Sequence, residues 1–330
     1  MEKTNVNGSL LELKNLSVIY KTEESIVSAV NNINLDIKYK ETLGLVGETG
    51  AGKTTTALAI LRLLPERTGR ITEGEIVYEG ENLINKTQNE MQHIRGACIS
   101  MIFQEPMTSL NPVFRVEDQI GEVFCVHKGM SKEQSRDAAL EMLKKVGIPA
   151  PEQRARNYPH QLSGGMRQRV MIAMALACDP ELMLADEPTT ALDVTIQAQI
   201  LDLMNDIRQR LGTGIILITH DLGVVAQTAD RVAVMYAGLI VEEAPVWELF
   251  EEPLHPYTIG LLKSLPHANL NDSGSSRHRL HVIPGKVPDL RKLPKGCRFQ
   301  DRCPEFDSVC LTDPELETKR PTRLVRCWKR

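Results

Sequence analysis

The chain has 330 residues, of which 42% are hydrophobic and 25% are charged, and these globular proportions exclude a disordered, collagen-like or coiled-coil protein. At about 150 residues per domain, the length predicts two domains. The net charge of −4 argues weakly against nucleic acid as the main partner. No apolar stretch approaches the ~18 residues that cross a bilayer, and the polar residues 1–5 do not resemble the start of a signal peptide, so we expect a cytosolic chain.

Short apolar runs alternate with helical patterns in the first part of the chain, which predicts an α/β layer structure. Residues 10–20 and 33–37 have the pattern of strands. The short run 42–46 suits a central strand that is buried on both faces. A helix is expected to begin at Lys53.

The middle of the chain has the pattern of an inserted helical subdomain. Ser131 and Gln134 are spaced as a capping box, which predicts a helix that ends at Val146, with Gly147 as its stop. Because the helical pattern of residues 116–146 lies between two sets of strands, it indicates an insertion.

Strand patterns return after this insertion. We expect strands at 215–218 and 232–235, and a helix at 195–211 before them. Residues 268–277 have the composition of a linker. Beyond this linker, Pro and Cys recur every few residues and no long period is visible.

The C-terminal tail differs from the rest of the chain in charge and in cysteine content. Residues 277–330 carry 14 Lys plus Arg and 7 Asp plus Glu, so this tail is basic whereas residues 1–276 have a net charge of −11. Of seven cysteines, four crowd into the last 34 residues: Cys297, Cys303, Cys310 and Cys327. The others, which we expect to be inert buried thiols, are Cys98, Cys125 and Cys178.

A glycine-rich loop follows the expected strand 42–46. Residues 47–54, Gly-Glu-Thr-Gly-Ala-Gly-Lys-Thr, fit the phosphate-binding pattern GxxxxGK[ST] between a strand and a helix. In such a loop the backbone N–H groups bind phosphate oxygens, Lys53 reaches the β- and γ-phosphates, and Thr54 binds Mg²⁺. The residues assigned to nucleotide binding here are Gly47, Glu48, Thr49, Gly50, Ala51, Gly52, Lys53, Thr54 and Thr55.

Two further motifs suit nucleotide hydrolysis. An apolar strand ends in Asp186, placed to hold Mg²⁺, and Glu187, placed to deprotonate an attacking water. Ser163, Gly164 and Gly165 precede a helix that we expect to begin at Met166, and they form a second anion site. Since the chain already has one phosphate loop, this second site is expected to serve a nucleotide held by another subunit.

In chain order, over about residues 10–266, these motifs resemble the nucleotide-binding subunit of an ABC transporter. The resemblance implies that Tyr20 stacks on adenine, Gln104 contacts Mg²⁺ and water and senses the membrane subunit, and His220 contacts the γ-phosphate. It further makes residues 163–165 the signature loop and places Asp193 in the D-loop motif Ala-Leu-Asp. Where the family has Gln, this chain has Met166, a change that keeps the backbone loop.

The resemblance also implies a fold. It is an α/β P-loop ABC ATPase with a RecA-like core, an antiparallel β subdomain and a helical subdomain at about 107–180. The nucleotide-binding domain would occupy residues 1–266, and a linker with a small Cys-rich C-terminal domain would occupy 267–330. Each complete ATP site would need two subunits facing head to tail.

Several segments are similar to the oligopeptide/dipeptide importers in particular: 104–112, 255–258, 283–285, 296–299 and 302–304. This similarity implies an ATPase that powers peptide import from the cytoplasmic side of a bacterial or archaeal membrane. Its partners would be a related ATPase subunit, two permease subunits and an extracytoplasmic binding protein. A nickel or glutathione importer, and a soluble ABC ATPase acting on nucleic acid or ribosomes, remain alternatives.

The four tail cysteines need a chemical explanation. Four thiolates suit tetrahedral Zn²⁺ or an iron–sulfur cluster, whereas a reducing cytosol disfavours disulfides. The absence of a CxxC pair counts against a zinc ribbon. Resemblance to importers that carry a [4Fe-4S] centre favours a cluster at Cys297, Cys303, Cys310 and Cys327, with zinc or plain thiols as alternatives. Nearby arginines would offset the cluster charge: Arg298, Arg302, Arg323 and Arg326.

Overall fold

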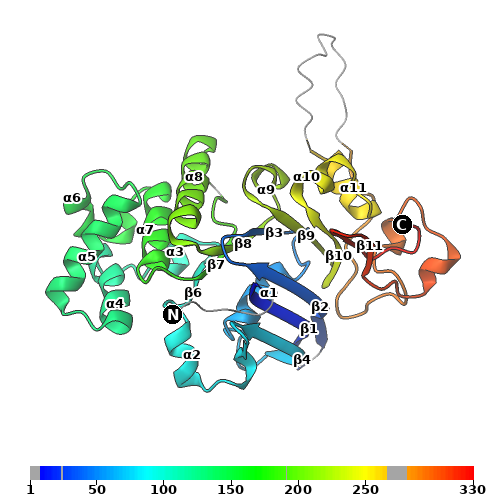
Figure 1. Cartoon of the computed structure of the whole chain (residues 1–330), viewed down its shortest axis with the longest axis horizontal. Helices are drawn as coiled ribbons and strands as arrows, with labels where there is room; N and C mark the ends of the chain where they lie inside the picture. Colours follow the sequence, from blue (N-terminus) through cyan, green and yellow to red (C-terminus); the bar gives the residue numbers. More distant parts are fainter. Residues whose placement is uncertain (1–7, 24, 191, 266–280) are drawn as a thin grey trace, which may run out of the picture.

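The computed structural model describes residues 8–23, 25–190, 192–265 and 281–330. In Figure 1 a core β-sheet crosses the middle of the molecule and a smaller sheet lies on one side of it. A helical subdomain lies at one end of the molecule, and the C-terminal tail lies at the other end. The expected linker at 268–277 is outside the described residues.

The core sheet has the strand order β11-β12-β10-β9-β3-β8-β7-β6. Neighbours from β9 to β6 run parallel, and the strands from β9 to β11 are antiparallel to one another. The strands outside the tail are β3 (Thr42–Val46), β6 (Ile99–Ile102), β7 (Leu182–Asp186), β8 (Gly214–Thr219), β9 (Arg231–Tyr236) and β10 (Leu239–Pro245). Because parallel strands end at one edge of the sheet, the segments after β3, β7 and β8 are brought together there.

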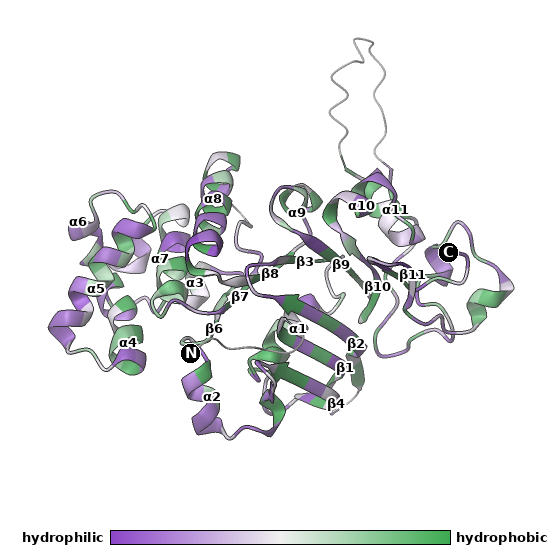
Figure 2. Cartoon of the chain, viewed as in Figure 1, coloured by the Kyte–Doolittle hydropathy of each residue, from purple (hydrophilic) through white to green (hydrophobic). Residues whose placement is uncertain are grey.

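The smaller sheet is antiparallel, with the order β2-β1-β4-β5. Its strands are β1 (Ser9–Lys21), β2 (Ile26–Lys38), β4 (Gly69–Tyr78) and β5 (Glu81–Asn82). Apolar side chains of this sheet, the core sheet and α1 (Lys53–Ile60) form one hydrophobic cluster. The alternating green and purple of β1, β2 and β4 in Figure 2 is typical of strands with one buried face. A 3₁₀ turn (Leu83–Asn85) and α2 (Gln88–Ile94) follow.

Apolar side chains of the helical subdomain and of one face of the core sheet form a second hydrophobic cluster. The helices of this subdomain are α3 (Pro106–Ser109), α4 (Val116–Lys128), α5 (Lys132–Lys145), α6 (Pro151–Ala155), a 3₁₀ turn (Pro159–Gln161) and α7 (Gly164–Leu176). The predicted capping box at Ser131 is present, and it starts α5. The helical stretch 116–146 is two helices, because Gly129 adopts φ 64° and ends α4.

Four helices cover the face of the core sheet opposite the small sheet (Figure 1): α8 (Val194–Leu211), α9 (Leu222–Thr228), α10 (Val246–Glu251) and α11 (Pro256–Lys263). The strands predicted at 42–46, 215–218 and 232–235 and the helix predicted at 195–211 are all present, within one residue at each end. None of the described helices combines the length and apolar character needed to span a bilayer.

The tail attaches directly to the core sheet. Two 3₁₀ turns (Gln300–Arg302 and Ser308–Leu311) precede a hairpin of β11 (Glu317–Arg320) and β12 (Arg323–Val325). Strand β12 pairs with β10, so the tail extends the core sheet. The sequence pattern did not predict these strands. Phe299 of the tail is 2% exposed and shares a hydrophobic cluster with β9, α9 and α11.

Candidate active site

The glycine-rich loop 47–54 connects β3 to α1 in a conformation that requires glycine. Gly47 has φ 155°, and Gly52, the N-cap of α1, has φ 107°. A Cβ at Gly47 would lie 2.1 Å from the carbonyl oxygen of Met235, and one at Gly52 would lie 2.5 Å from that of Ala29. The loop therefore packs tightly against the core and leads into the N-terminus of α1, where helix N–H groups favour an anion.

Lys53 places a buried cation inside this loop. The residue is 6% exposed, and its ammonium donates hydrogen bonds to the carbonyls of Gly47 at 2.7 Å and Glu48 at 3.2 Å. Burial lowers the pKa of Lys53, and the carboxylates of Glu187, Asp186 and Glu48 oppose this shift. The loop thus surrounds a positive charge that is poorly hydrated, which favours a highly charged anion such as a triphosphate.

Glu187 follows β7 and is the centre of a polar cluster. Its φ of 47° turns the chain sharply, and its carboxylate lies 3.0 Å from Nδ1 of His220 through Oε1. Its Oε2 accepts hydrogen bonds from Gln104 at 3.0 Å and Thr190 at 2.9 Å. Burial favours a higher pKa for Glu187, but the hydrogen bonds from His220 and Thr190 outweigh it, and the pKa is lowered. The carboxylate is therefore ionised at neutral pH.

Asp186, the last residue of β7, suits a cation. It is 2% exposed, and its Oδ1 has no hydrogen-bond partner among the described residues. Burial raises the pKa of Asp186, whereas a hydrogen bond from Thr54 and the charge of Lys53 lower it. A buried, unpartnered carboxylate oxygen beside a hydroxyl is a donor set that Mg²⁺ prefers, so these residues fit the expected metal.

One cavity of about 410 Å³ lies at the phosphate loop and the carboxylate of Glu187, whereas Asp186 is not among the residues that line it. Tyr20 lies at this cavity, with its hydroxyl 3.3 Å from Oγ1 of Thr55. The structure thus brings together Tyr20, the phosphate loop, Gln104, Glu187 and His220. The residues that line the cavity are Tyr20, Val27, Ala29, Thr49, Gly50, Ala51, Gly52, Lys53, Thr54, Thr55, Gln104, Glu187, His220 and Leu290.

The second glycine loop lies outside this cavity. Ser163 is the N-cap of α7 and accepts a hydrogen bond from the backbone N–H of Met166 at 3.3 Å. The helix accordingly begins at Gly164, two residues before the predicted start at Met166, because Ser163 caps it. Ser163 and Gly164 are exposed, and they do not line the nucleotide cavity with Lys53.

Asp193 lies beside the second glycine loop. It caps α8 by accepting a hydrogen bond from the N–H of Ile196 at 2.9 Å. Gly165 packs so closely on this helix that a Cβ there would lie 2.9 Å from Cγ2 of Ile196. Ala191, the first residue of the expected D-loop, is outside the described residues. The two loops therefore form a separate exposed surface, available to another molecule.

The four tail cysteines line one small cavity together with His255 and Trp328. Burial is the main reason that the pKa of Cys297 is raised to about 11, and the neighbouring cysteines contribute to the same shift. All four are free thiols. However, within the described ranges no three His, Cys, Asp or Glu side chains stand at metal-binding spacing. The thiols share a cavity but do not form an assembled ligand set.

The other three cysteines differ from expectation. Cys98, Cys125 and Cys178 are partly exposed rather than buried. The physical reason is that Cys98 lies in the turn before β6 and Cys178 in the turn after α7, so that only Cys125 is within a helix. Burial nevertheless raises the pKa of Cys178, as an unreactive thiol requires.

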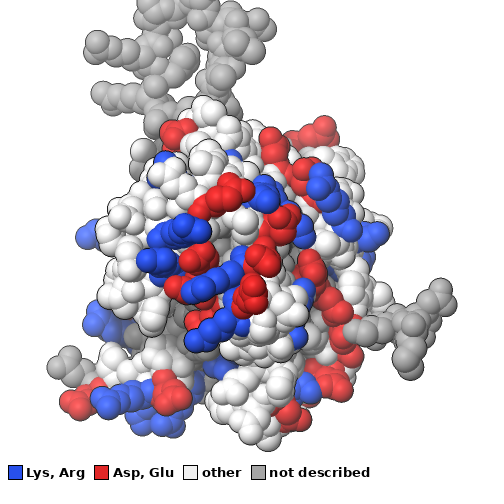
Figure 3. Space-filling model, turned by 90° about the vertical axis from the view of Figure 1, so that its left-hand side faces the viewer, with Lys and Arg blue, Asp and Glu red and all other residues white. Residues whose placement is uncertain are grey.

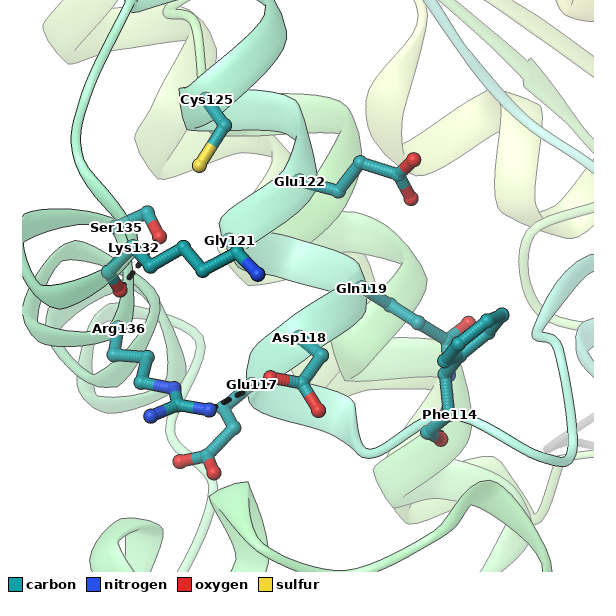
Figure 4. Close-up of a pocket in the computed structure, with 10 residues that line it drawn as sticks. All are labelled: Phe114, Glu117, Asp118, Gln119, Gly121, Glu122, Cys125, Lys132, Ser135 and Arg136. Atoms are coloured by element: carbon teal, nitrogen blue, oxygen red, sulfur yellow. Dashed lines mark hydrogen bonds and ion pairs between the residues drawn. The ribbon is translucent and has the colours of Figure 1, made fainter.

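A larger cavity, about 490 Å³, lies between α4 and α5 (Figure 4). Carboxylates and cations both line it, and Arg136 lies 3.4 Å from Asp118 across it. Figure 4 shows Glu117 and Glu122 on the same helix as Asp118. Acidic side chains outnumber basic ones here, which makes this cavity unsuitable for a triphosphate.

Several residues that line this cavity or contact its neighbours were not predicted from the sequence, among them Thr190, Leu290 and Arg302. Thr190 lies three residues after Glu187, and this short separation could have predicted that the two side chains are close. Leu290 lines the cavity and Arg302 contacts the phosphate loop, but both belong to the tail. No local pattern indicates such a contact between distant segments.

Comparisons with protein families agree with the geometry in both parts of the chain. A family model described as "ABC transporter" matches residues 30–190, and one described as "Oligopeptide/dipeptide transporter, C-terminal region" matches residues 241–310. The second match begins in β10 and extends through the cysteine-rich tail as far as Cys310.

Curated relatives are similar over nearly the whole chain. The oligopeptide transport ATP-binding protein AppD of Bacillus subtilis is 50% identical over 97% of this chain and 97% of the relative. The dipeptide transport ATP-binding protein DppD of the same organism is 49% identical over 97% and 94%. The oligopeptide transport ATP-binding protein OppD of Salmonella typhimurium is 49% identical over 97% and 93%.

Solved structures share the fold. The dimeric ATP-binding cassette MJ0796, in a post-hydrolysis state with ADP and phosphate, is 33% identical, with a TM-score of 0.65 over 72% of this chain and 98% of the cassette. The cassette cbiO1 of Clostridium perfringens, part of the transporter complex cbiONQ, is 27% identical with a TM-score of 0.63 over 74% and 92%. The predicted α/β cassette architecture is confirmed by these similarities.

Proposed function

This chain belongs to the ABC transporter family, as an ATP-binding subunit of its oligopeptide/dipeptide branch, and from this membership we propose that it powers the import of dipeptides or oligopeptides through a membrane permease. It is an ATPase. The observation that carries the peptide assignment is the match of residues 241–310 to the peptide-transporter C-terminal region, together with about half identity to peptide-transport ATPases over 97% of the chain.

In the proposed reaction, Glu187 accepts a proton from the water that attacks the γ-phosphate. His220 and Gln104 hold this carboxylate and orient the water. The support is that Gln104 and His220, from two other segments, each lie 3.0 Å from the carboxylate of Glu187 at one cavity, and that the lowered pKa of Glu187 keeps this carboxylate ionised and able to accept a proton. Lys53 binds the β- and γ-phosphates, and Tyr20 stacks on the adenine.

Magnesium would be held by Thr54, Asp186 and Gln104. When bound, it neutralises charge on the β- and γ-phosphates. The unpartnered Oδ1 of Asp186 supports this assignment.

A second ATPase subunit completes each site. The exposed loop of Ser163, Gly164 and Gly165, with Asp193, contacts the nucleotide bound by the partner, and ATP joins the two subunits head to tail. The support is that Ser163, Gly164 and Asp193 are exposed and, like Gly165, do not line the nucleotide cavity, and that the similar cassette MJ0796 was solved as a dimer. In this branch we propose a related but different ATPase subunit as the partner.

Two permease subunits and an extracytoplasmic binding protein form the rest of the proposed importer, and the chain would act at the cytoplasmic face of a bacterial or archaeal membrane. An apolar groove of about 250 Å³ between the helical subdomain and the core supports permease docking. Phe103 lines the groove and is 40% exposed. The next residue along the chain, Gln104, donates a hydrogen bond to Glu187.

For the four tail cysteines we propose a [4Fe-4S] cluster, with Zn²⁺ as the alternative. The support is that Cys297, Cys303, Cys310 and Cys327 line one cavity. Iron and sulfide analysis of anaerobically purified protein tests this assignment. A Cys310→Ser variant should lose iron and a Cys125→Ser control should retain it, whereas colourless protein with stoichiometric zinc would exclude the cluster.

Nucleic acid is a poorer candidate partner. On the face of the helical subdomain, Figure 3 shows Lys and Arg interleaved with Asp and Glu, whereas nucleic-acid binding favours a continuous basic area. Many tail arginines are engaged with carboxylates, as Arg320 is with Glu252 and Arg330 with Glu305. This pairing reduces the basic charge that the sequence suggests for the tail.

The decisive experiment is transport by the assembled complex in proteoliposomes, with Glu187→Gln and the exposed Glu133→Gln as matched variants. Dipeptide or oligopeptide loaded on the binding protein should stimulate ATP hydrolysis. We expect Glu187→Gln to lower kcat at least ~100-fold and to retain ATP binding, because it removes only the base, while Glu133→Gln stays at the wild-type rate. Stimulation by nickel or glutathione but not by peptides would refute the peptide assignment.

A further inference from the structure

The cysteine-rich tail touches the phosphate loop through one arginine. Arg302 is 6% exposed, and its guanidinium donates two hydrogen bonds to the carboxylate of Glu48, from Nη1 at 2.9 Å and from Nη2 at 3.0 Å. Glu48 is the second residue of the loop 47–54. Such paired hydrogen bonds fix both distance and orientation, so Arg302 constrains the loop from 254 positions away in the sequence.

Arg302 is itself rigidly held. Its Nε donates to the carbonyl of Pro284 at 2.9 Å, and its Nη1 lies 3.3 Å from the hydroxyl of Tyr236. The guanidinium also lies over the rings of Tyr236 and Phe299, at 5.7 and 5.9 Å. The hydroxyl of Tyr257 accepts a hydrogen bond from the backbone N–H of Glu48 at 2.9 Å. Both the main chain and the side chain of Glu48 are therefore fixed.

Glu48 would otherwise be unfavourable in this position. Its carboxylate is part of the loop that binds a triphosphate, and like charges repel. Burial lowers the pKa of Lys53, and the negative charge of Glu48 is one of the contributions that oppose this shift. An arginine that neutralises Glu48 removes this repulsion from the phosphate site.

The tail also reaches the other end of the nucleotide cavity. Leu290 lines that cavity together with Tyr20, Val27 and Ala29. Its carbonyl accepts a hydrogen bond from the N–H of Ser28 at 3.2 Å, which fixes the tail against β2. Because Leu290 lies with apolar residues and the aromatic ring of Tyr20, its side chain is placed to pack on a nucleobase.

We propose that the C-terminal tail forms part of the ATP site, with Arg302 as a positioning residue that neutralises and orients Glu48 and Leu290 as a residue that binds the base. This proposal rests on the ATPase activity and not on the identity of the transported substrate. It assigns to the tail a direct role in nucleotide affinity.

Calorimetric binding to the full-length chain tests the role of Arg302. Arg302→Gln should weaken MgATP binding about tenfold, MgADP less and adenosine hardly at all, because the uncovered carboxylate of Glu48 repels phosphates. The double variant Arg302→Gln with Glu48→Gln should recover to within about threefold of wild type. Arg302→Lys keeps the charge without the paired hydrogen bonds, so its affinity for MgATP should lie between those of wild type and Arg302→Gln. This variant also keeps the proposal testable if Arg302→Gln does not fold.

Several results would overturn the role of Arg302. These are wild-type ATP affinity in Arg302→Gln, equal loss for ATP and adenosine, and a double variant as weak as the single one. Steady-state hydrolysis gives a second readout, since KM should rise while kcat stays within about twofold. Arg320→Gln, which removes an exposed tail arginine paired with Glu252, is the matched control and should leave both constants unchanged.

Leu290 has a different expected signature. Leu290→Ala should weaken ATP, ADP and adenosine by the same factor, about three- to tenfold, because it acts at the base. Leu311→Ala, an exposed tail leucine away from the cavity, should change none of them. A loss confined to ATP, or no loss, would refute the role of Leu290. All of these measurements omit permease and peptide, so failure of the transport proposal would not affect them.

Discussion

A buried ion pair attaches the tail to the core sheet. The side chains of Arg323 in β12 and Glu242 in β10 are both 0% exposed, and Nη2 of Arg323 lies 2.7 Å from Oε1 of Glu242. Glu242 also accepts hydrogen bonds from the backbone N–H groups of Leu254 and His255, each at 2.8 Å. Replacement of Arg323 by Met therefore leaves a buried carboxylate with two backbone donors and no cation.

The contacts that Glu242 keeps in Arg323→Met set the size of the destabilisation. Removal of one partner of a buried ion pair costs about 3–5 kcal/mol. Because the N–H groups of Leu254 and His255 still stabilise the carboxylate of Glu242, we expect Arg323→Met to cost an amount near the lower end of this range, about 3 kcal/mol. This free energy corresponds to roughly a 100-fold change in the equilibrium for local opening. Nε and Nη1 of Arg323 have no hydrogen-bond partner among the described residues, but Nε lies 4.0 Å from Oε2 of Glu248 and Nη2 also donates to the carbonyl of Glu252 at 2.6 Å, and both contacts are lost with the guanidinium.

Amide hydrogen exchange measures this change where it occurs. In Arg323→Met, exchange of the β10 and β12 amides should accelerate roughly 100-fold, while β3 at the centre of the sheet keeps its protection. Arg320→Met in the neighbouring strand is the matched control. Its partner Glu252 is exposed, so that variant should exchange like the wild type.

A double variant separates the buried charge from lost packing. Arg323→Met combined with Glu242→Gln removes the uncompensated charge and should regain part of the lost protection. If the double variant exchanges as fast as the single one, or if Arg323→Met exchanges within about threefold of the wild type, the reasoning from the ion pair is wrong.

Three further outcomes follow from the described geometry. Burial, with a smaller contribution from His93, lowers the pKa of His127 in the folded chain. As the pH falls, the unfolded chain therefore binds a proton at His127 before the folded chain does, which favours unfolding. The thermal midpoint of wild type should accordingly fall relative to that of His127→Gln between about pH 7.5 and pH 5. Gly165→Ala should lower the unfolding free energy by about 1–3 kcal/mol through its clash with helix α8, whereas Gly164→Ala, which meets open space, should not, as thermal unfolding will show. Tyr20→Ala should weaken ATP binding at least ~5-fold by calorimetry, and Tyr20→Phe should keep most of the affinity because the stacking face remains.

Features set by neighbouring residues could be predicted from the sequence. The strand 42–46, the helix starting at Lys53 and the capping box at Ser131 depend on contacts within a few residues, and all three are present. The helix start at Gly164 was missed by two residues, because a capping side chain at Ser163 brings two glycines into the first turn.

The polar cluster around Glu187 could be predicted only in part. The order of motifs along strands indicates which residues reach one edge of the sheet, and it identifies Glu187 and His220. The contacts of Glu187 with Gln104 and Thr190 depend on the positive φ of Glu187 and on how the helical subdomain packs on the core. Neither is encoded in a local pattern.

The tail was the least predictable part. Strands β11 and β12 have four and three residues, too few for a period to be visible, and β12 depends on pairing with β10. The charge of the tail was also a poor guide. Arg302 and Arg323 are among its cations, yet both are buried against carboxylates of the ATPase core rather than presented to a partner.

These buried pairs give the tail a physical place in the ATPase. Arg323 fixes the hairpin to the core sheet, and Arg302 lies beside the cysteine cavity through its neighbour Cys303 while it holds Glu48 in the phosphate loop. A change at the cysteine cavity that moves residues 299–303 must therefore also move the carboxylate of Glu48 in the phosphate loop. Any dependence of ATP hydrolysis on the state of the four thiols should accordingly disappear in the double variant that lacks both Arg302 and Glu48, since that variant has no charged contact between tail and loop through which the change could act.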